Sequence, residues 1–481
     1  MTLETLPTWA RTAVCASAGA LLLAGCAAQP LAKKQPAIKA IAEYQTTQSF
    51  AAPEGAWPVD SWWKLYGDPQ LDALIGEALR DSPSIAVAEA RLRRAQAAVQ
   101  MQRSASLPQL IGDASITEQR QSYNYLSPPN FTPQGWNDYG RATLDFSWEL
   151  DFWGKNRAAL AAATSETDAA RADAAQARLT LATAIASAYA ELAHQYAVLD
   201  TTRSALQVRT ETAELFRHRF ENGLETLGSV RQVDARRAAA QADVLSLEEQ
   251  IALQKNRIAA LLGAGPDRGR TISAPSAQVA RDFALPDQLS ANLLGRRPDI
   301  TAARLRAEAS AAKIKEARAE FYPNVNLAAF IGVQSLNLDM LTKNGSSVGS
   351  AGPAISLPIF TAGRLRGQLR GVEAEYAESV ANYDRAVIQA LQEVADAAVS
   401  QRALTPQLAR TNEAVAAAQE AWRIQSNRYE GGLATYLDVL NAQDYLLSNL
   451  RTQADLRSRA LSLDVALIRA LGGGYSTTQT D

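Results

Sequence analysis

The chain holds few of the residues that build metal centres and redox sites. It has two histidines and two cysteines among 481 residues. His194 and His218 lie 24 positions apart (218 − 194), and no cysteine or carboxylate cluster accompanies them at the spacing of metal ligands. The sequence also lacks a glycine-rich phosphate loop and a nucleophile elbow. We therefore expect no enzyme, no cofactor and no metal, and we interpret both histidines as solvated surface residues.

An excess of charge of one sign is also missing, since 48 Lys and Arg residues balance 50 Asp and Glu residues. This balance gives no reason to expect nucleic acid as a partner. Aromatic residues make up only 7% of the chain, whereas alanine is abundant among the 47% of hydrophobic residues. Segments rich in Ala, Gln, Glu and Arg favour long helices over thick β-sheet cores.

Beyond residue 25 no apolar run reaches the length of a membrane helix. Any membrane span of the mature protein must therefore consist of strands. The apolar run over residues 12–24 follows Arg11, and the small residues that close it lead to Cys26, as in a secretory signal peptide.

Leu23-Ala-Gly-Cys26 resembles the bacterial lipobox, which predicts cleavage before Cys26 and acylation of this cysteine. The alternative is an ordinary signal peptide with a cysteine at this place by chance. Ala27 stands where an aspartate often retains such lipoproteins in the inner membrane, which favours the outer membrane. The mature chain would then keep no free thiol and no disulfide, because Cys15 is removed with the signal peptide.

The same series of elements occurs twice along the chain. Pro83 recurs as Pro298, an offset of 215 residues (298 − 83), and the motif at Phe220 recurs at Tyr429, an offset of 209 (429 − 220). A period of about 210 residues is too long for a solenoid, so we interpret it as one duplicated structural unit. We expect a signal peptide over 1–25, an acylated N-terminal tether over 26–66, a first repeat over 67–263, a linker over 264–285, a second repeat over 286–473 and a tail over 474–481.

Each repeat contains one predicted β-hairpin, with strands at about 110–119 and 143–153 in the first and about 324–333 and 348–360 in the second. In the clearest strand, 143–153, aromatic and aliphatic residues alternate with polar and charged ones, which is typical of an outer-membrane barrel. The alternative, an amphipathic strand of a soluble sandwich, is disfavoured because few other segments could pair with it. By the same alternation, Asp145, Glu149 and Asp151 would line a water-filled lumen.

Each hairpin leads into a long predicted helix, over 155–220 and over 364–429. A helix of 66 residues (220 − 154 and 429 − 363) extends about 100 Å at ~1.5 Å per residue. Each long helix ends in a short turn, at 220–227 and 429–436, and a return helix follows over 228–262 and 437–471. Each pair of helices is therefore an antiparallel hairpin.

Four strands are too few for a closed barrel, which needs about eight, and an open sheet edge cannot face hydrocarbon. The chain must then share a barrel with other copies of itself: two copies would give about eight strands and three about twelve. Parallel copies of the long helices would continue the lumen as a helical tube. The sequence thus predicts a conduit.

Five motifs carry a resemblance to a known family. They are Trp62-Trp63-Lys-Leu-Tyr-Gly-Asp-Pro-Gln-Leu-Asp72, Trp148-Glu-Leu-Asp-Phe-Trp-Gly154, Arg296-Arg297-Pro298-Asp299-Ile300, Leu357-Pro-Ile-Phe-Thr-Ala-Gly-Arg364 and Tyr429-Glu-Gly-Gly-Leu-Ala-Thr-Tyr-Leu-Asp-Val-Leu440. In this order and spacing the chain resembles the TolC-like outer-membrane efflux channels, in particular lipoproteins of the NodT or OprM type.

The resemblance covers nearly the whole mature chain and implies a mainly helical fold with membrane β-structure. It implies a homotrimer whose twelve-stranded β-barrel in outer-membrane lipid is continued by a periplasmic α-helical barrel. A periplasmic adaptor and an inner-membrane pump are the implied partners, and drugs or other small toxic compounds are the implied cargo. The rival functions are an exit duct for protein secretion of the type I kind and a non-conducting structural lipoprotein.

The resemblance also assigns sites. In the family the tips of the helical hairpins meet the adaptor, and the matching residues are Phe220, Gly223, Leu224, Thr226, Tyr429, Gly432, Leu433 and Thr435. The alternative is a pair of plain turns in which glycine only ends a helix. A periplasmic gate is implied at Asp438 and Asn441, with Asp444 one helical turn further, although Asn441 and Ala434 depart from the common pattern. The alternative for these three is an ordinary solvated helix face.

Overall fold

The computed structural model describes residues 35–124, 129–277, 283–287 and 289–476. These residues form two compact units. The first contains Leu92–Ala169 and Ala303–Tyr383, and the second contains Lys39–Arg91, Ala170–Ala302 and the chain from Asp384 onward. The predicted signal peptide and the acylation site at Cys26 lie outside the described residues. No helix among the described residues combines the length and the apolar character that a membrane crossing requires.

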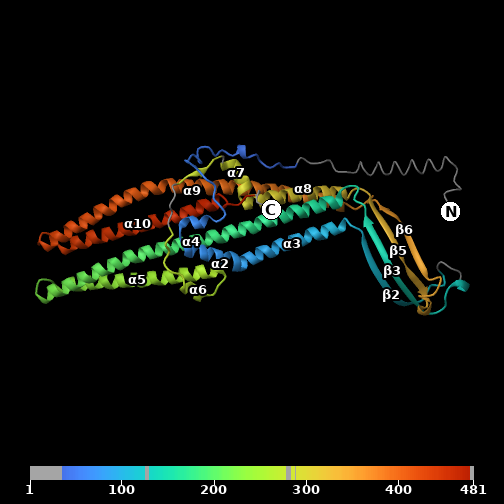
Figure 1. Cartoon of the computed structure of the whole chain (residues 1–481), viewed down its shortest axis with the longest axis horizontal. Helices are drawn as coiled ribbons and strands as arrows, with labels where there is room; N and C mark the ends of the chain where they lie inside the picture. Colours follow the sequence, from blue (N-terminus) through green and yellow to red (C-terminus); the bar gives the residue numbers. More distant parts are fainter. Residues whose placement is uncertain (1–34, 125–128, 278–282, 288, 477–481) are drawn as a thin grey trace. The chain divides into compact units, whose positions relative to one another are not determined.

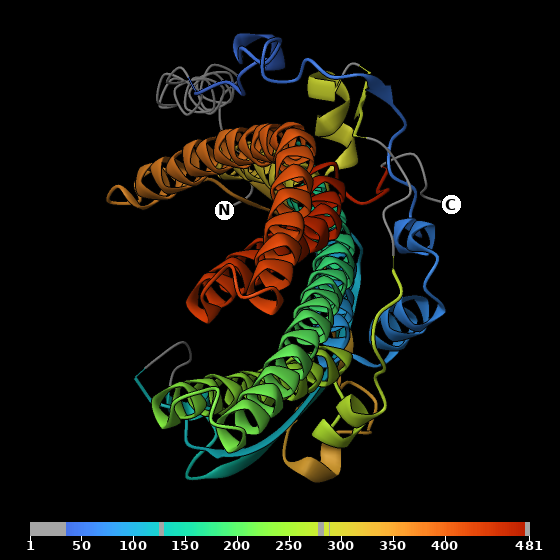
Figure 2. The same cartoon turned by 90° about the vertical axis from the view of Figure 1, so that its left-hand side faces the viewer.

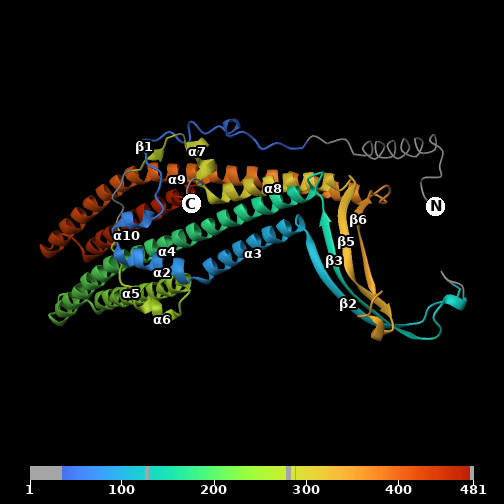
Figure 3. The same cartoon turned by 45° about the vertical axis from the view of Figure 1, so that its right-hand side comes forward.

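One four-stranded antiparallel sheet dominates the first unit (Figure 3). Its strands are β2 (Gln109–Gln119), β3 (Asn137–Glu149), β5 (Asn324–Leu336) and β6 (Ser347–Ser356), in the order β2-β3-β5-β6. The two hairpins therefore join through β3 and β5, where Trp148 pairs with Leu327. Strands β2 and β6 lie at the edges. Pro353 lies within β6, opposite Leu327 of β5.

The strands β3 and β6 end four residues before the predicted limits of 153 and 360. After β3, the carboxylate of Asp151 accepts hydrogen bonds from the N–H groups of Asn156 (3.3 Å) and Arg157 (2.9 Å). Asp151 thus lies beyond the end of β3 and caps the helix that follows. Alternation of residue types continues past the strand end, because nothing in the pattern marks where pairing stops.

Two long helices start directly after the hairpins, α4 (Lys155–Glu221) and α9 (Arg364–Glu430). Left-handed glycines precede both, Gly154 with φ 78° and Gly363 with φ 88°, and allow the sharp change from strand to helix. The beginnings of α4 and α9 belong to the first unit with the ends of α3 (Pro83–Ala105) and α8 (Pro298–Ala319). A small core of Ile314, Ala317 and Leu369 packs α8 against α9.

The second unit contains the two helical hairpins, α4 with α5 (Leu227–Leu262) and α9 with α10 (Tyr436–Ala470). Figure 2 shows them end on, the first in green and the second in orange and red. The short helices α2 (Pro69–Asp81), α6 (Pro266–Arg270) and α7 (Leu289–Arg296) lie in the same unit (Figure 1). The bounds of the long helices lie within one residue of the predicted ones.

The core of the second unit surrounds α4 with large buried side chains, among them Trp62, Ile185, Tyr189 and Ile258. Asp68 is the N-cap of α2 and accepts the backbone N–H of Gln70 at 2.9 Å. It also accepts the Tyr189 hydroxyl at 2.7 Å. Burial opposes ionisation of this carboxyl, but the hydrogen bonds outweigh it and lower the pKa of Asp68.

The predicted tether has structure from Lys39 onward. Strand β1 (Glu54–Gly55) pairs in parallel with β4 (Leu285–Pro286), and the carbonyl of Ser49 accepts a hydrogen bond from Arg402 at 2.8 Å. We call residues 39–55 the N-terminal strap. This part of the predicted tether therefore belongs to the second unit.

Candidate functional site

The two helical hairpins end in turns of the same geometry. In the first, Gly223 has φ 73°, and the N–H of Leu224 donates to the carbonyl of Arg219 at 2.8 Å. In the second, Gly432 has φ 72°, and Leu433 makes the equivalent bond at 2.7 Å. This is the Schellman end of a helix, which favours glycine because other residues are strained at positive φ. Helix termination alone therefore explains both glycines.

Threonines begin the two return helices. Oγ1 of Thr226 accepts the N–H of Ser229 at 3.2 Å. At the start of α10, Oδ2 of Asp438 accepts the N–H of Thr435 at 2.9 Å and the hydroxyl of Thr435 at 2.7 Å. These two hydrogen bonds lower the pKa of Asp438. Asp438, a predicted gate residue, thus has a capping task in the helix.

Apolar side chains stand on both turns. Leu224 is 66% exposed and Leu433 is 73% exposed. A Cβ atom added at Gly223 or at Gly432 would meet no other atom within 4 Å. Phe220 is also exposed. Both tips therefore offer an accessible apolar surface on a rigid turn.

Three aromatic rings connect the second tip to the end of α4. The ring of Tyr436 lies 4.0 Å from that of Phe216 and 5.4 Å from that of Tyr429. The Tyr429 hydroxyl donates to Glu225 at 3.3 Å, and the guanidinium of Arg219 lies 5.3 Å from the centre of the same ring. Burial raises the pKa of Tyr429. Tyr429, predicted to contact an adaptor, is thus engaged between the two hairpins.

Asp444 carries a second link between the hairpins, from α10 to both helices of the first. Its two carboxylate oxygens accept hydrogen bonds from Arg209 and from Arg236, each at 3.1 Å. Farther along α10, Arg451 pairs with Asp243 at 3.5 Å. We call the pairs made by Asp444 and Arg451 the latch. Asn441 is exposed, and its side chain forms no hydrogen bond with any described residue.

The latch arginines escaped the sequence reasoning, because their partner lies more than 200 positions away. One signal was available. Arg236 and Arg237 are adjacent basic residues in an alanine-rich stretch. Such a pair on a predicted helical hairpin indicates an acidic partner.

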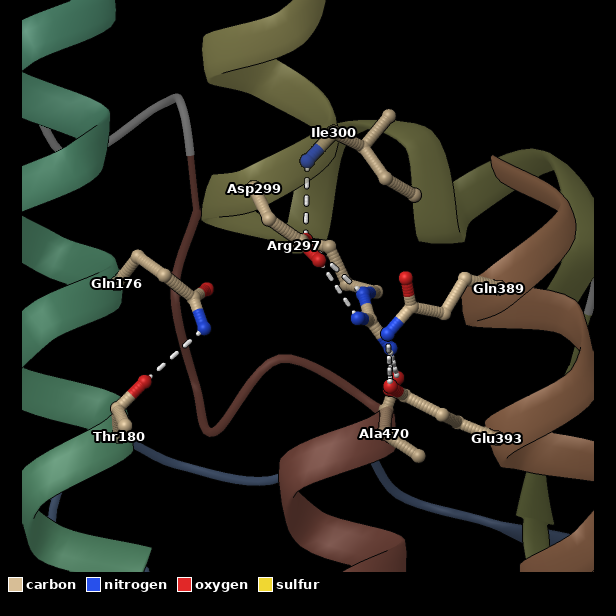
Figure 4. A network of polar contacts seen from close by, with 8 residues as sticks. All are labelled: Gln176, Thr180, Arg297, Asp299, Ile300, Gln389, Glu393 and Ala470. Atoms are coloured by element: carbon tan, nitrogen blue, oxygen red, sulfur yellow. Dashed lines mark hydrogen bonds and ion pairs between the residues drawn. The ribbon is translucent and has the colours of Figure 1, made fainter. Parts of the chain in front are cut away.

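At the other end of the second hairpin, Arg297 joins three helices (Figure 4). Its guanidinium donates to Glu393 of α9 at 2.7 Å, to Asp299 of α8 at 2.7 Å and to the carbonyl of Ala470 in α10 at 3.0 Å. The Arg297 side chain is only 6% exposed. Burial disfavours the charged form, but the two carboxylates outweigh it and raise the pKa of Arg297. We call this network the clamp.

His194 also joins α4 to α10. Its Nδ1 lies 3.0 Å from the hydroxyl of Ser458, and its Nε2 lies 3.4 Å from Asp455. The interpretation of this histidine as a solvated surface residue is therefore wrong. His218 does stand exposed near the first tip. The described residues contain no group of three or more His, Cys, Asp or Glu that could hold a metal ion.

The two remaining residues of the predicted lumen lie on β3. Asp145 accepts the hydroxyl of Thr143 at 2.7 Å, and Glu149 pairs with Lys155 at 2.5 Å. Asp145, Glu149 and Thr143 share one face of the strand, because their positions differ by even numbers.

Comparison with known proteins places the chain in a family. The family described as "Outer membrane efflux protein" matches residues 74–264 and 289–473. Fusaric acid resistance protein FusA of Burkholderia cepacia is 39% identical over 362 residues, which are 74% of this chain and 68% of FusA. Multidrug resistance outer membrane protein MdtP of Escherichia coli is 31% identical over 429 residues, 87% of each chain.

The crystal structure of the outer membrane protein VceC from Vibrio cholerae superimposes with a TM-score of 0.83 at 50% identity. The match covers 87% of this chain and 100% of VceC. The predicted fold class is therefore confirmed, as is the expectation that the chain is not an enzyme. The chain belongs to the outer membrane efflux protein family and is an exit channel of the outer membrane that extends into the periplasm.

Proposed function

We propose that three copies of this chain form a trimeric conduit that exports drugs or other small toxic compounds. The edges of the sheet carry this proposal. Strands β2 and β6 each have one side without a partner strand in the described chain. In hydrocarbon, each unsatisfied N–H or C=O group costs several kcal/mol, about the strength of a hydrogen bond in an apolar medium. Pairing β6 of one copy with β2 of the next removes every edge and yields a barrel of about twelve strands.

The polar face of β3 indicates the lining of the conduit, and Cys26 indicates its anchor. Asp145 and Glu149 stand on the polar face of β3, which supports a water-facing, negatively charged lumen. Cys26 would carry acyl chains that hold the N-terminus in the membrane.

The tips support a periplasmic adaptor as the partner, with an inner-membrane pump behind it. Both turns repeat the same backbone and the same exposed leucine, Leu224 and Leu433. Folding requires the glycines but does not require exposed leucines at the ends of both hairpins. A partner that repeats its own binding surface would contact the two tips in the same way.

The latch is the element that holds the periplasmic end closed. Asp444 pairs with two arginines of the first hairpin, and its side chain remains 45% exposed. Exposed ion pairs contribute about 0.2–1 kcal/mol each, so the latch can open at low cost when an adaptor binds. Of the three predicted gate residues, Asp444 therefore has the strongest structural support. Asp438 serves the helix cap, and Asn441 supplies no link.

The names of two relatives favour small compounds as cargo. One is a fusaric acid resistance protein and the other a multidrug resistance protein. To test this, the gene is deleted from its host, and drug susceptibility and secreted proteins are measured together. We expect greater drug sensitivity with an unchanged set of secreted proteins. Loss of a secreted protein with normal drug resistance would instead favour the secretion duct.

The conduit itself is tested with the purified full-length protein in planar bilayers. We expect discrete single-channel currents from a species that chemical crosslinking shows to be a trimer. A stable trimer that never conducts would favour the structural lipoprotein, and a monomer would contradict the shared barrel.

A further inference from the structure

The second hairpin has a loosely packed stretch between its clamp and its tip. In α9 no side chain is buried between Leu404 and Val415. In α10 none is buried between Leu446 and Leu461. The corresponding part of α4, 209 positions earlier, buries Leu199, Thr202 and Ala205.

Pro406 lies inside this stretch of α9. A proline has no N–H to donate to the carbonyl four residues earlier, here that of Arg402, and its ring weakens the helix at this point. The equivalent position of α4 is Ala197 (406 − 209), which keeps the helical hydrogen bond. Only one of the two hairpins thus carries a built-in weak point.

A shallow, wide-open surface groove lies beside the proline. It is lined by Pro406, Gln407 and Thr411 of α9 and by Thr452 and Leu456 of α10. Side chains that border a groove open to solvent can rearrange without displacing close-packed neighbours. The surroundings of Pro406 therefore leave room for a change in helix direction.

The clamp side of this stretch is held in place by three contacts within the second unit. Arg297 joins Glu393 to the end of α10. Arg402, one turn before the proline, donates to Ser49 of the N-terminal strap. His194 binds α10 through Ser458.

The tip side is held to the first hairpin by the aromatic contacts of Tyr429 and Tyr436 with Phe216 and by ion pairs. The latch pairs of Asp444 and Arg451 are partly exposed, and exposed pairs are weak and screened by salt. Within the tip side, Gln453 of α10 donates to Asn412 of α9 at 2.7 Å, so these two helices remain joined to each other.

We propose that Pro406 is the hinge on which the outer part of the second hairpin, residues 407–454, moves as one body when the latch opens. The clamp and the strap fix the inner part, and the first hairpin stays straight. This inference rests on the proposed latch. It adds the position of the bend.

Amide hydrogen exchange of the full-length protein tests the hinge without any reference to conduction. We expect the amides of residues 402–411 to exchange about tenfold faster than those of 193–202, because local opening is easier at a weak point of a helix. Pro406→Ala restores the missing hydrogen bond and should reduce this difference. Thr405→Ala, at an exposed neighbour, is the control and should not. Equal exchange of the two segments in the unmodified protein would overturn the hinge.

Channel currents then show whether the hinge serves the latch. Asp444→Ala should increase the open fraction, and Pro406→Ala in the same chain should lower it again about fivefold, the worth of one helical hydrogen bond. The Pro406→Ala protein should fold at least as stably, because alanine is the better helix former. If Asp444→Ala opens the channel and the added Pro406→Ala leaves it open, the result supports the latch and contradicts the hinge. If Asp444→Ala has no effect, the latch is wrong, and the exchange rates decide on the hinge.

Discussion

The two helical hairpins have nearly identical plans and different internal support. Helices α4 and α9 are each 67 residues long, and both hairpins turn through the same left-handed glycine geometry. In its middle part the first hairpin buries residues such as Leu199 and Thr202, whereas the second has Pro406 beside a shallow surface groove. The two copies of the duplicated unit therefore differ in packing: the middle of the first hairpin buries side chains, and the middle of the second does not.

The ion pairs of the second hairpin are buried at one end and partly exposed at the other. Arg297 is buried and pairs with two carboxylates, so that removing it leaves charges without a partner. Asp444 makes two pairs as well, but these are accessible to water and salt. Arginine–carboxylate pairs therefore hold the clamp end of the hairpin in place, whereas the latch pairs of the same kind can open.

The largest expected effect concerns the tips. Gly223→Asp and Gly432→Asp each place a charge and a strained residue on an exposed turn, and we expect each to abolish drug resistance while the trimer still forms. The local strain of about 1–2 kcal/mol is too small to unfold the protein. Resistance is measured in a host that lacks other exit channels. Gly265→Asp, which also meets no atom within 4 Å but has ordinary φ, is the control. Normal resistance in both tip variants would contradict adaptor binding there.

The next effect concerns the clamp. Arg297→Gln leaves Asp299 and Glu393 without their cation, and we expect a loss of about 3 kcal/mol in the free energy of unfolding, roughly a hundredfold in the equilibrium constant. Denaturant or thermal unfolding measures it. Arg203→Gln removes only the exposed pair with Glu248 and should cost less than about 1 kcal/mol. Equal losses in the two variants would show that the clamp is no stronger than a surface pair.

The latch should give a smaller effect. Asp444→Ala removes two exposed pairs, together about 1.4 kcal/mol, and should raise the open fraction of single channels about tenfold. Asp455→Ala removes the carboxylate next to His194 at the clamp side of the hinge. It should leave the currents unchanged. If the currents rose equally in both variants, Asp444 would have no special role in closing the channel.

The smallest effect is expected at Asp438. The hydroxyl and the N–H of Thr435 lower the pKa of this carboxyl, so its contribution is present above the ordinary Asp value of about 4 and is lost as the pH falls through the lower folded value. Asp438→Asn should speed exchange of the first amides of α10 about twofold at neutral pH and remove their further acceleration in acid. Channel selectivity should not change. A large change in cation selectivity would instead support Asp438 as a gate residue.

Signals in the local sequence predicted the frame of the molecule well. Gly223, Gly432 and the threonines Thr226 and Thr435 fix where the long helices end, because turn and cap geometry depend on residues a few positions apart. The strand ends were less certain, as Asp151 shows. Its spacing continues the alternation, although its carboxylate already serves the next helix.

Contacts between distant segments could not be predicted in this way. The strap depends on Ser49 and Arg402, which are 353 positions apart, and the latch on Arg209 and Asp444, 235 apart. Neither the strap nor the latch has a sequence period or motif from which its partner could be predicted. The family resemblance located the turn near Asp444, but only the packing of the two hairpins shows that this aspartate, and not Asp438, joins them.

A reversible crosslink between the hairpins tests most directly whether the second one must move for the channel to conduct. Arg209→Cys with Asp444→Cys is treated with a flexible bis-thiosulfonate, which forms a disulfide with each thiol and releases sulfinate, and currents are recorded before and after reduction. His194→Cys with Ser458→Cys ties the hairpins at the clamp side and is the control. The account predicts that the first crosslink closes the channel, that reduction reopens it, and that the control conducts throughout. Full conduction with the 209–444 crosslink in place would contradict it.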